Sequence, residues 1–188
     1  FDVTFLSFLE VDVEGNVNVS KLGKKPYLTA GCGGLVDITA RVTGAPGDEG
    51  VLIATGNENS GLSVFVQDGR LVVDYNAFND HGIIKSTVAV PAGDSTLVAR
   101  LRRGAGRTGT ISLEVNGQPA GTVELPLVMM MISSVGASIG YNHGSAVSDR
   151  YEAPFAFGGT LHSLEIQLID DVDPAVQQAR AAAEMSRQ

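Results

Sequence analysis

The sequence contains no tryptophan and a single cysteine, and each scarcity excludes a class of site. Cys32 has no second cysteine with which to form a disulfide inside the chain. With one cysteine and three scattered histidines, the sequence also lacks the ligand clusters of a structural zinc site. We therefore expect no cofactor. Without tryptophan, any stacking against a sugar ring has to come from tyrosine or phenylalanine.

Basic residues are scarce as well. The chain has 13 Lys and Arg against 21 Asp and Glu, for a formal net charge of -8. Binding to nucleic acid needs clustered basic side chains that displace counterions from phosphates, so we expect no nucleic-acid partner. Long apolar runs are missing from the start of the chain, where Asp2, Glu10 and Asp12 interrupt the first stretch. That stretch is neither a signal-peptide core nor a membrane span, and we expect no membrane partner.

The short motifs of hydrolytic enzymes are absent too. No Gly-x-Ser-x-Gly nucleophile elbow occurs. The paired-carboxylate pattern of glycosidases, Glu-x-Asp-x-x-Glu, is approached only by residues 10–14, which are one residue short and are interpreted as a solvated strand face. These absences predict that the chain is not an enzyme on its own.

The sequence does contain glycine-rich turns and short stretches of alternating polarity. Val36, Ile38, Ala40 and Val42 alternate with polar residues, which is the period of a half-buried strand. Asp68-Gly69 and Asn116-Gly117 each separate two such stretches and predict tight hairpin turns. About a dozen short strands of this kind predict an all-β fold, an antiparallel jelly-roll β-sandwich.

One domain accounts for this pattern. We expect the sandwich to span residues 1–172, with an N-terminal hairpin at 1–22. Asp173 and Pro174 have the residue types of a helix N-cap and first turn, so residues 173–188 are predicted to form a short C-terminal helix.

Several segments match one known family in order and spacing: Gly50–Ala54, Gly61–Asn76, Pro91–Gly93, Gly109–Gly117 and Ser145–Leu161. Over about residues 34 to 169 the chain resembles the C-terminal concanavalin A-like, laminin-G-like module of bacterial arylsulfatases. The resemblance implies a jelly-roll accessory module that serves packing, oligomerisation or substrate presentation in sulfate-ester hydrolysis. A sulfatase catalytic domain, or a second copy of the chain, would then be its partner.

The chemistry of that family does not carry over to any residue here. Sulfatases use a Cys/Ser-x-Pro-x-Arg motif, whereas Cys32 is followed by Gly33 and Gly34. The Asp-rich metal cluster of the catalytic domain is also missing. If the resemblance holds, the chain is a fragment of an arylsulfatase whose catalytic domain is absent from this sequence.

Candidate site residues follow from the aromatic and donor-rich segments. For a glycan we select Tyr75, Asn76, Phe78, Tyr141 and Asn142. Tyr75 is expected to end a strand, with Asn76 and Phe78 on the next loop as a shallow sugar site, although aromatic residues more often fill a core. For calcium the candidates are Asn142 and Asp149, but calcium usually takes more carboxylates at closer spacing.

The apolar run around Met129, Met130 and Met131 is a candidate interface, although a buried central strand is the more favoured interpretation. Two alternatives to the sulfatase accessory module remain open. One is a stand-alone, lectin-like carbohydrate-binding module, and the other is a structural protein that self-assembles.

Overall fold

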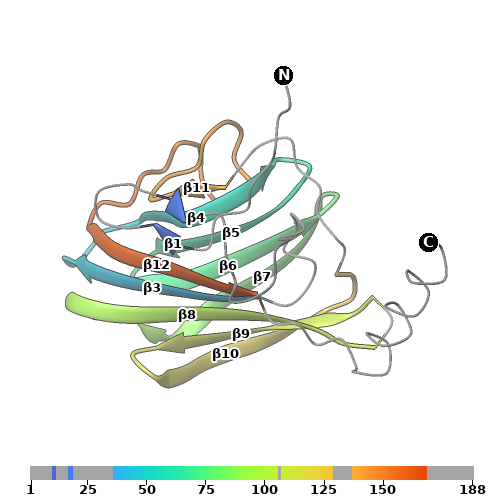
Figure 1. Ribbon diagram of the computed structural model, residues 1–188, viewed down its shortest axis with the longest axis horizontal. Coiled ribbons are helices and arrows are strands. Elements are labelled where there is room, and N and C mark those ends of the chain that lie inside the picture. The colour runs from blue at the N-terminus through green and yellow to red at the C-terminus, as the bar shows by residue number, and fades with distance from the viewer. Residues whose placement is uncertain (1–9, 12–16, 19–35, 106, 129–136, 169–188) are drawn as a thin grey trace, which may run out of the picture.

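A computed structural model describes residues 10–11, 17–18, 36–105, 107–128 and 137–168. Within these residues, two antiparallel β-sheets pack face to face as a sandwich (Figure 1). The predicted all-β fold is confirmed for this part of the chain. The predicted helix at 173–188 and the apolar run Met129–Met131 lie outside the described residues.

The larger sheet has seven strands in the order β10-β9-β8-β3-β12-β1-β2. Its strands are β1 (Glu10–Val11), β2 (Val17–Asn18), β3 (Val36–Gly44), β8 (Gly93–Arg103), β9 (Gly109–Val115), β10 (Gln118–Leu125) and β12 (Thr160–Leu168). The smaller sheet has five strands in the order β11-β4-β5-β6-β7. Its strands are β4 (Gly50–Asn57), β5 (Ser60–Gln67), β6 (Arg70–Ala77), β7 (Asp80–Ala89) and β11 (Ser138–Ile139).

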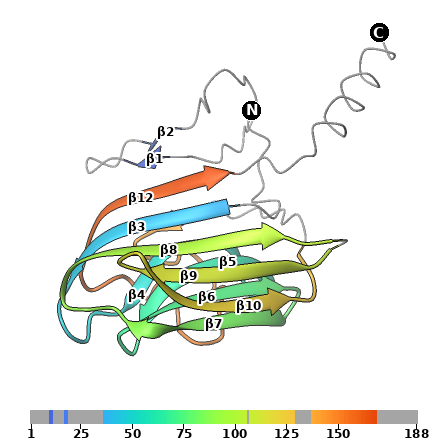
Figure 2. The same cartoon turned by 90° about the horizontal axis from the view of Figure 1, so that it is seen from below.

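The core lies between the two sheets and follows from the alternation of side chains. In β3, Val36, Ile38, Ala40 and Val42 are buried, while the residues between them are partly or fully exposed. Side chains on successive residues of a strand point to opposite faces, so this strand presents one apolar face to the core and one polar face to solvent. The sheets also meet along one side, where β7 contacts β10 (Figure 2).

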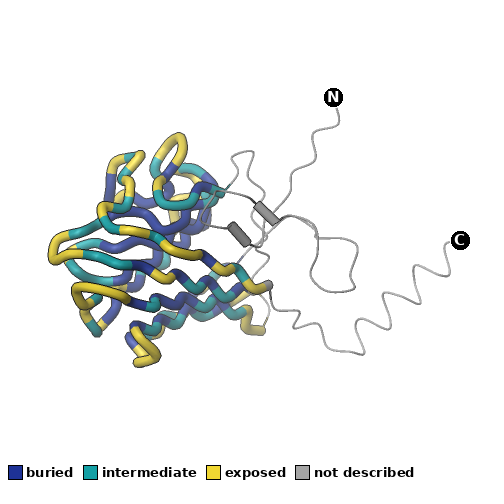
Figure 3. The backbone as a smooth tube through the Cα atoms, turned by 60° about the vertical axis from the view of Figure 1, so that its left-hand side comes forward, coloured by how far each residue is buried: buried dark blue, intermediate teal, exposed yellow. Residues whose placement is uncertain are grey.

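The inner strands of the smaller sheet are buried on both faces, whereas edge strand β7 is partly exposed. Burial runs almost without interruption along β5 and β6. One face contributes to the core, and the other is covered by residues 140–159, which we term the covering loop. Tyr151 and Phe155 of this loop pack on Phe65 of β5, with the rings of Phe65 and Tyr151 edge to face and their centroids 5.1 Å apart. Exposed residues lie mainly at the hairpin tips and in parts of this loop (Figure 3).

Three hairpins turn through two residues that both have positive φ, as a type I′ turn requires. Asp68-Gly69 joins β5 to β6 and Asn116-Gly117 joins β9 to β10, both as predicted. The third turn, between β6 and β7, has Phe78 and Asn79 at its centre, with φ of 56° and 66°. The sequence analysis did not predict this turn, because neither of its central residues is glycine.

Candidate functional site

A cluster of exposed residues lies where two hairpin tips of the smaller sheet meet. The backbone N–H of Asn79, in the β6–β7 turn, donates to the carbonyl of Asn59, in the β4–β5 turn, at 3.2 Å. We call the exposed residues of these two turns the aromatic rim; they are Glu58, Asn59, Phe78, Asn79 and Asp80.

Phe78 is the aromatic residue of the rim. Within the described residues, the large apolar side chains open to solvent are those of Phe78, at 68% exposure, and Tyr141, at 44%. Phe78 also adopts a left-handed backbone conformation, which is unfavourable for a bulky side chain and costs on the order of 1–3 kcal/mol. Little burial offsets this cost, so Phe78 is poorly explained by folding stability alone.

Asn76 fixes the rim from beneath. It is fully buried at the end of β6. Its side-chain N–H groups donate to the carbonyls of Glu58, at 2.8 Å, and Val147, at 3.0 Å. Its side-chain oxygen accepts from the backbone N–H of Asn79 at 2.8 Å. One side chain therefore ties both turns to the covering loop.

The rim is acidic. Glu58 and Asp80 are exposed carboxylates on either side of the turn contact. The hydroxyl of Ser145, in the covering loop, donates to the carboxylate of Glu58. Carboxylates and amides can form hydrogen bonds with the hydroxyl groups of a ligand, whereas the carboxylates repel a ligand that carries its own negative charge.

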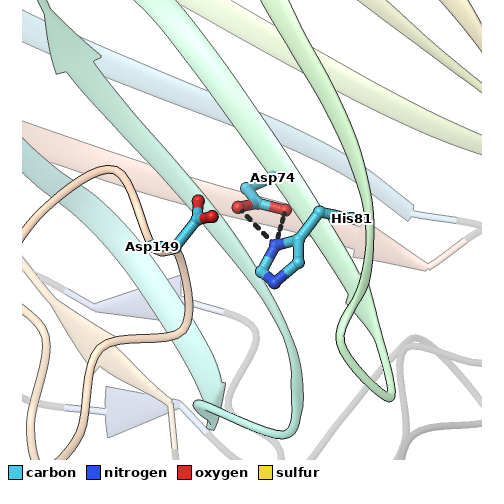
Figure 4. A group of neighbouring side chains, drawn as sticks. All are labelled: Asp74, His81 and Asp149. Atoms are coloured by element: carbon cyan, nitrogen blue, oxygen red, sulfur yellow. Dashed lines mark hydrogen bonds and ion pairs between the residues drawn. The ribbon is translucent and has the colours of Figure 1, made fainter.

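A second group of side chains lies beside the rim, on the face of the smaller sheet that the covering loop overlies (Figure 4). Asp74 of β6 is fully buried, and both of its carboxylate oxygens lie near Nδ1 of His81 on β7, at 2.9 and 3.0 Å. Asp149 of the covering loop is exposed and completes the group. One ligand atom from each of the three residues lies within 4.8 Å of the other two. We refer to these residues as the Asp74 cluster.

Burial is the main influence on Asp74. It raises the pKa of the carboxyl above its ordinary value, because the charged form loses hydration. Hydrogen bonds from Ser148 and His81 stabilise the carboxylate and limit this rise in pKa, while the negative charge of Asp149 adds to it. The cluster thus brings two carboxylates together at a site where ionisation is already unfavourable.

Within the covering loop, Asn142 and Tyr151 organise the backbone. The side-chain oxygen of Asn142 accepts from the Tyr151 hydroxyl at 2.7 Å and from the backbone N–H of Val147 at 3.2 Å. Its amide N–H groups donate to the carbonyls of His143 and Ser145. The hydroxyls of Tyr151 and Ser63 lie 2.8 Å apart. These contacts hold the loop on the sheet.

The structure separates the glycan candidates chosen from the sequence. Tyr75 is 1% exposed and belongs to the core between the sheets, so it presents no face to a sugar. Asn76 lies in β6 and not on the loop after it, and its side chain supports the rim from inside. Phe78 is exposed as expected. Tyr141 is exposed beyond edge strand β11, separated from β6 by β4 and β5.

The two calcium candidates are separated as well. The side chain of Asn142 is buried and hydrogen-bonded inside the loop, whereas Asp149 lies with Asp74 and His81. Sequence analysis missed Asp74 and His81. The signal for Asp74 was its position between Val73 and Tyr75, since a residue between two core-facing neighbours must point to the opposite face. The interface candidate, Met129–Met131, lies outside the described residues.

No family model and no curated protein matches the chain. Solved structures do match. The CBM40 carbohydrate-binding module of the Ruminococcus gnavus IT-sialidase, bound to α2,3 sialyllactose, has a TM-score of 0.55 at 13% identity, covering 74% of this chain and 79% of that one. Mouse laminin α1 domains LG4-5 have a TM-score of 0.51 at 13% identity, covering 88% and 40%. The LG1-3 region of the laminin α2 chain has a TM-score of 0.56 at 16% identity, covering 80% and 31%.

No helix long and apolar enough to cross a membrane is found among the residues described.

The likenesses to solved structures concern the fold. None of the three matched structures is named as a sulfatase, so the resemblance to arylsulfatase modules is supported only as far as the shared architecture. The described part of the chain has the concanavalin A-like, laminin-G-like jelly-roll fold.

Proposed function

We propose that this chain is a non-catalytic module that binds a glycan at the aromatic rim. In this proposal the ring of Phe78 packs against the apolar face of a sugar, and Glu58, Asn59 and Asp80 form hydrogen bonds with its hydroxyl groups. The observation that carries the proposal is Phe78 itself, an exposed aromatic ring kept in an unfavourable backbone conformation at a hairpin tip.

The support beneath the ring strengthens the argument. A binding residue needs a fixed position, because ordering a flexible loop on binding costs free energy. Asn76 joins the two turns and the covering loop through three hydrogen bonds, all from a fully buried side chain. The backbone of the turn that carries Phe78 is therefore held in place before any ligand arrives.

The fold is compatible with this function. A neighbour of the same architecture is a carbohydrate-binding module solved with sialyllactose, although a shared fold at 13% identity does not carry its ligand to this chain. The more specific role, an accessory module in sulfate-ester hydrolysis, draws no support from the comparisons.

The acidic rim narrows the class of glycan. Glu58 and Asp80 lie on the rim, and Asp149 lies in the cluster beside it. The basic side chains nearest in sequence to these groups have other partners: Lys85 pairs with Asp68 at 2.8 Å, and Arg150 bonds to Gln67 at 3.2 Å. We infer that the rim prefers neutral sugars over sialylated or sulfated ones.

The test is a glycan array probed with the labelled chain, followed by calorimetric titration of the best ligand. The Phe78→Asn variant should lose at least about tenfold in affinity, or roughly 1.4 kcal/mol, because it removes the ring but suits the turn. The matched control is Tyr141→Ser, which removes the other exposed aromatic ring and should leave affinity unchanged. Absence of any glycan binding at millimolar ligand, or equal affinity of the Phe78→Asn variant, would overturn the proposal.

A further inference from the structure

The Asp74 cluster combines three side chains of two ligand types, contributed by three elements. Asp74 comes from β6, His81 from β7 and Asp149 from the covering loop. These are two carboxylates and an imidazole, so the group is more than an accumulation of acidic side chains. Asp74 and His81 belong to neighbouring strands of one hairpin, and the fold brings Asp149 to them from the covering loop, which is distant in sequence.

The spacing of the donors suits a single ion. Nδ1 of His81 lies 2.9 and 3.0 Å from the two oxygens of Asp74. Without an ion this contact is a hydrogen bond, and a bound ion would take the place of the shared proton. Two ligands held at about 2.1 Å each in the tetrahedral geometry of zinc lie about 3.4 Å apart, so Asp74 and His81 would have to separate by only about half an ångström. Asp149 completes a triangle within 4.8 Å. Because Asp149 is exposed on a loop, a small adjustment of its side chain would close the remaining distance, and water could fill the other positions.

The charge of the cluster also favours a cation. The carboxylates of Asp74 and Asp149 lie close together beside His81, and Asp74 is fully buried. Among the described residues, no ion pair joins Asp74 or Asp149 to a lysine or arginine. A bound divalent ion would neutralise both carboxylates at once.

The surroundings provide the support that metal ligands need. The hydroxyl of Ser148 donates to the carboxylate of Asp74 and so helps to orient it. Ser148 is itself buried and directly precedes Asp149, so the same loop segment orients one ligand and supplies another.

We propose that Asp74, His81 and Asp149 bind a divalent transition-metal ion of the zinc type. An imidazole nitrogen together with carboxylates suits zinc or manganese better than calcium, which prefers a larger set of oxygen ligands. The site differs from a calcium site built on Asn142 and Asp149, because Asn142 is occupied inside the loop. It does not depend on glycan binding.

Calorimetry on the full chain tests the proposal, after removal of metal with a chelator. Zinc chloride should bind with one ion per chain, and excess zinc should raise the melting temperature by about 5 °C. Calcium chloride at the same concentration should produce neither effect. Absence of zinc binding at millimolar concentration, or binding of calcium in preference to zinc, would overturn the assignment.

Variants separate this site from nonspecific binding to surface histidines. Asp149→Asn changes an exposed side chain, so it should fold normally and weaken zinc binding at least about tenfold. His81→Gln should do the same. The matched control is His143→Gln, which removes an exposed imidazole of the covering loop outside the cluster and should leave zinc affinity unchanged. Equal losses in the His143 and Asp149 variants, or unchanged affinity of Asp149→Asn, would contradict the site.

Discussion

The side-chain oxygen of Asn76 accepts a hydrogen bond from the backbone N–H of Asn79 at 2.8 Å. Asn76 lies near the end of β6 and Asn79 at the centre of the β6–β7 turn, so this contact fixes the turn that carries Phe78. Asn76 is buried and stabilises the turn, whereas Phe78 is exposed and determines the chemistry of its surface. Their effects can be measured separately.

Replacing Asn76 with alanine should destabilise the fold by about 3 kcal/mol. The substitution removes the side-chain partner of the Glu58 and Val147 carbonyls, and it leaves the Asn79 N–H only its contact with the Asn59 carbonyl. Buried polar groups that lose their partners are costly. Chemical denaturation monitored by circular dichroism gives the free energy of unfolding. Asn59→Ala serves as the control, since Asn59 joins the rim through its backbone, and it should change stability by less than about 0.5 kcal/mol. Equal stability of the Asn76 variant would contradict this role.

Replacing Phe78 with asparagine should leave stability unchanged or raise it by about 1 kcal/mol. Asparagine tolerates the left-handed conformation that phenylalanine adopts here, and the exposed ring loses little burial. Thermal and chemical denaturation measure the difference. Phe78→Leu keeps a bulky side chain in the strained turn and should show no gain. A loss of more than about 1 kcal/mol in the asparagine variant would mean that the ring supports the fold.

Tyr151 should make the protein sensitive to alkaline pH. Burial raises the pKa of its phenol above the ordinary 10.0, because the phenolate would lose hydration in the interior. The folded-state pKa is therefore higher than the unfolded one, so the stabilisation is fully present below pH 10 and is lost as the pH rises through the folded-state pKa.

The Tyr151→Phe variant checks this dependence. It should lose about 1.5 kcal/mol at neutral pH, because Asn142 and Ser63 lose a hydrogen-bond partner. Above pH 10 the variant should lack the decline in stability due to this phenol, so its difference from the natural sequence should shrink. Unfolding free energies at pH 7, 9, 10 and 11 measure the trend, and a constant difference across this range would count against it.

The charge of the rim should set the preference among glycans. A neutral oligosaccharide should bind more tightly than its sialylated counterpart, by up to about tenfold, since each nearby carboxylate contributes on the order of 1 kcal/mol of repulsion. The double substitution Glu58→Gln with Asp80→Asn should reduce the difference, as should added salt. Calorimetry on the matched pair measures both effects. Tighter binding of the sialylated glycan by the natural sequence would refute the charge argument while leaving glycan binding intact.

Local patterns in the sequence determined the strands and two of the turns. Apolar and polar residues alternate along a strand wherever one face is buried and the other faces solvent, and β3 follows this rule from Val36 to Val42. Asp68-Gly69 and Asn116-Gly117 form their turns because these residue types tolerate positive φ. In the Phe78-Asn79 turn only Asn79 is of such a type, and the turn also depends on the contacts of Asn76 and Asn59.

Alternation could not assign the faces of β6, because both are buried. Tyr75 was therefore selected as a surface aromatic residue, although it belongs to the core. Asn76 was assigned to the loop after β6, although it is a buried residue that supports the turn. Only the covering loop, which is distant in sequence, decides that the outer face of this strand is closed to solvent.

The sequence by itself determined an acidic, all-β jelly roll, because composition, alternation and turn residues act over a few neighbouring positions. The tertiary structure alone decided that Asp74, His81 and Asp149 meet. Their donor atoms come together through strand register, which pairs β6 with β7, and through packing of the covering loop on the sheet. The β6–β7 pairing is a local hairpin contact, whereas the approach of Asp149 is long-range and is not specified by the residues next to it in the chain.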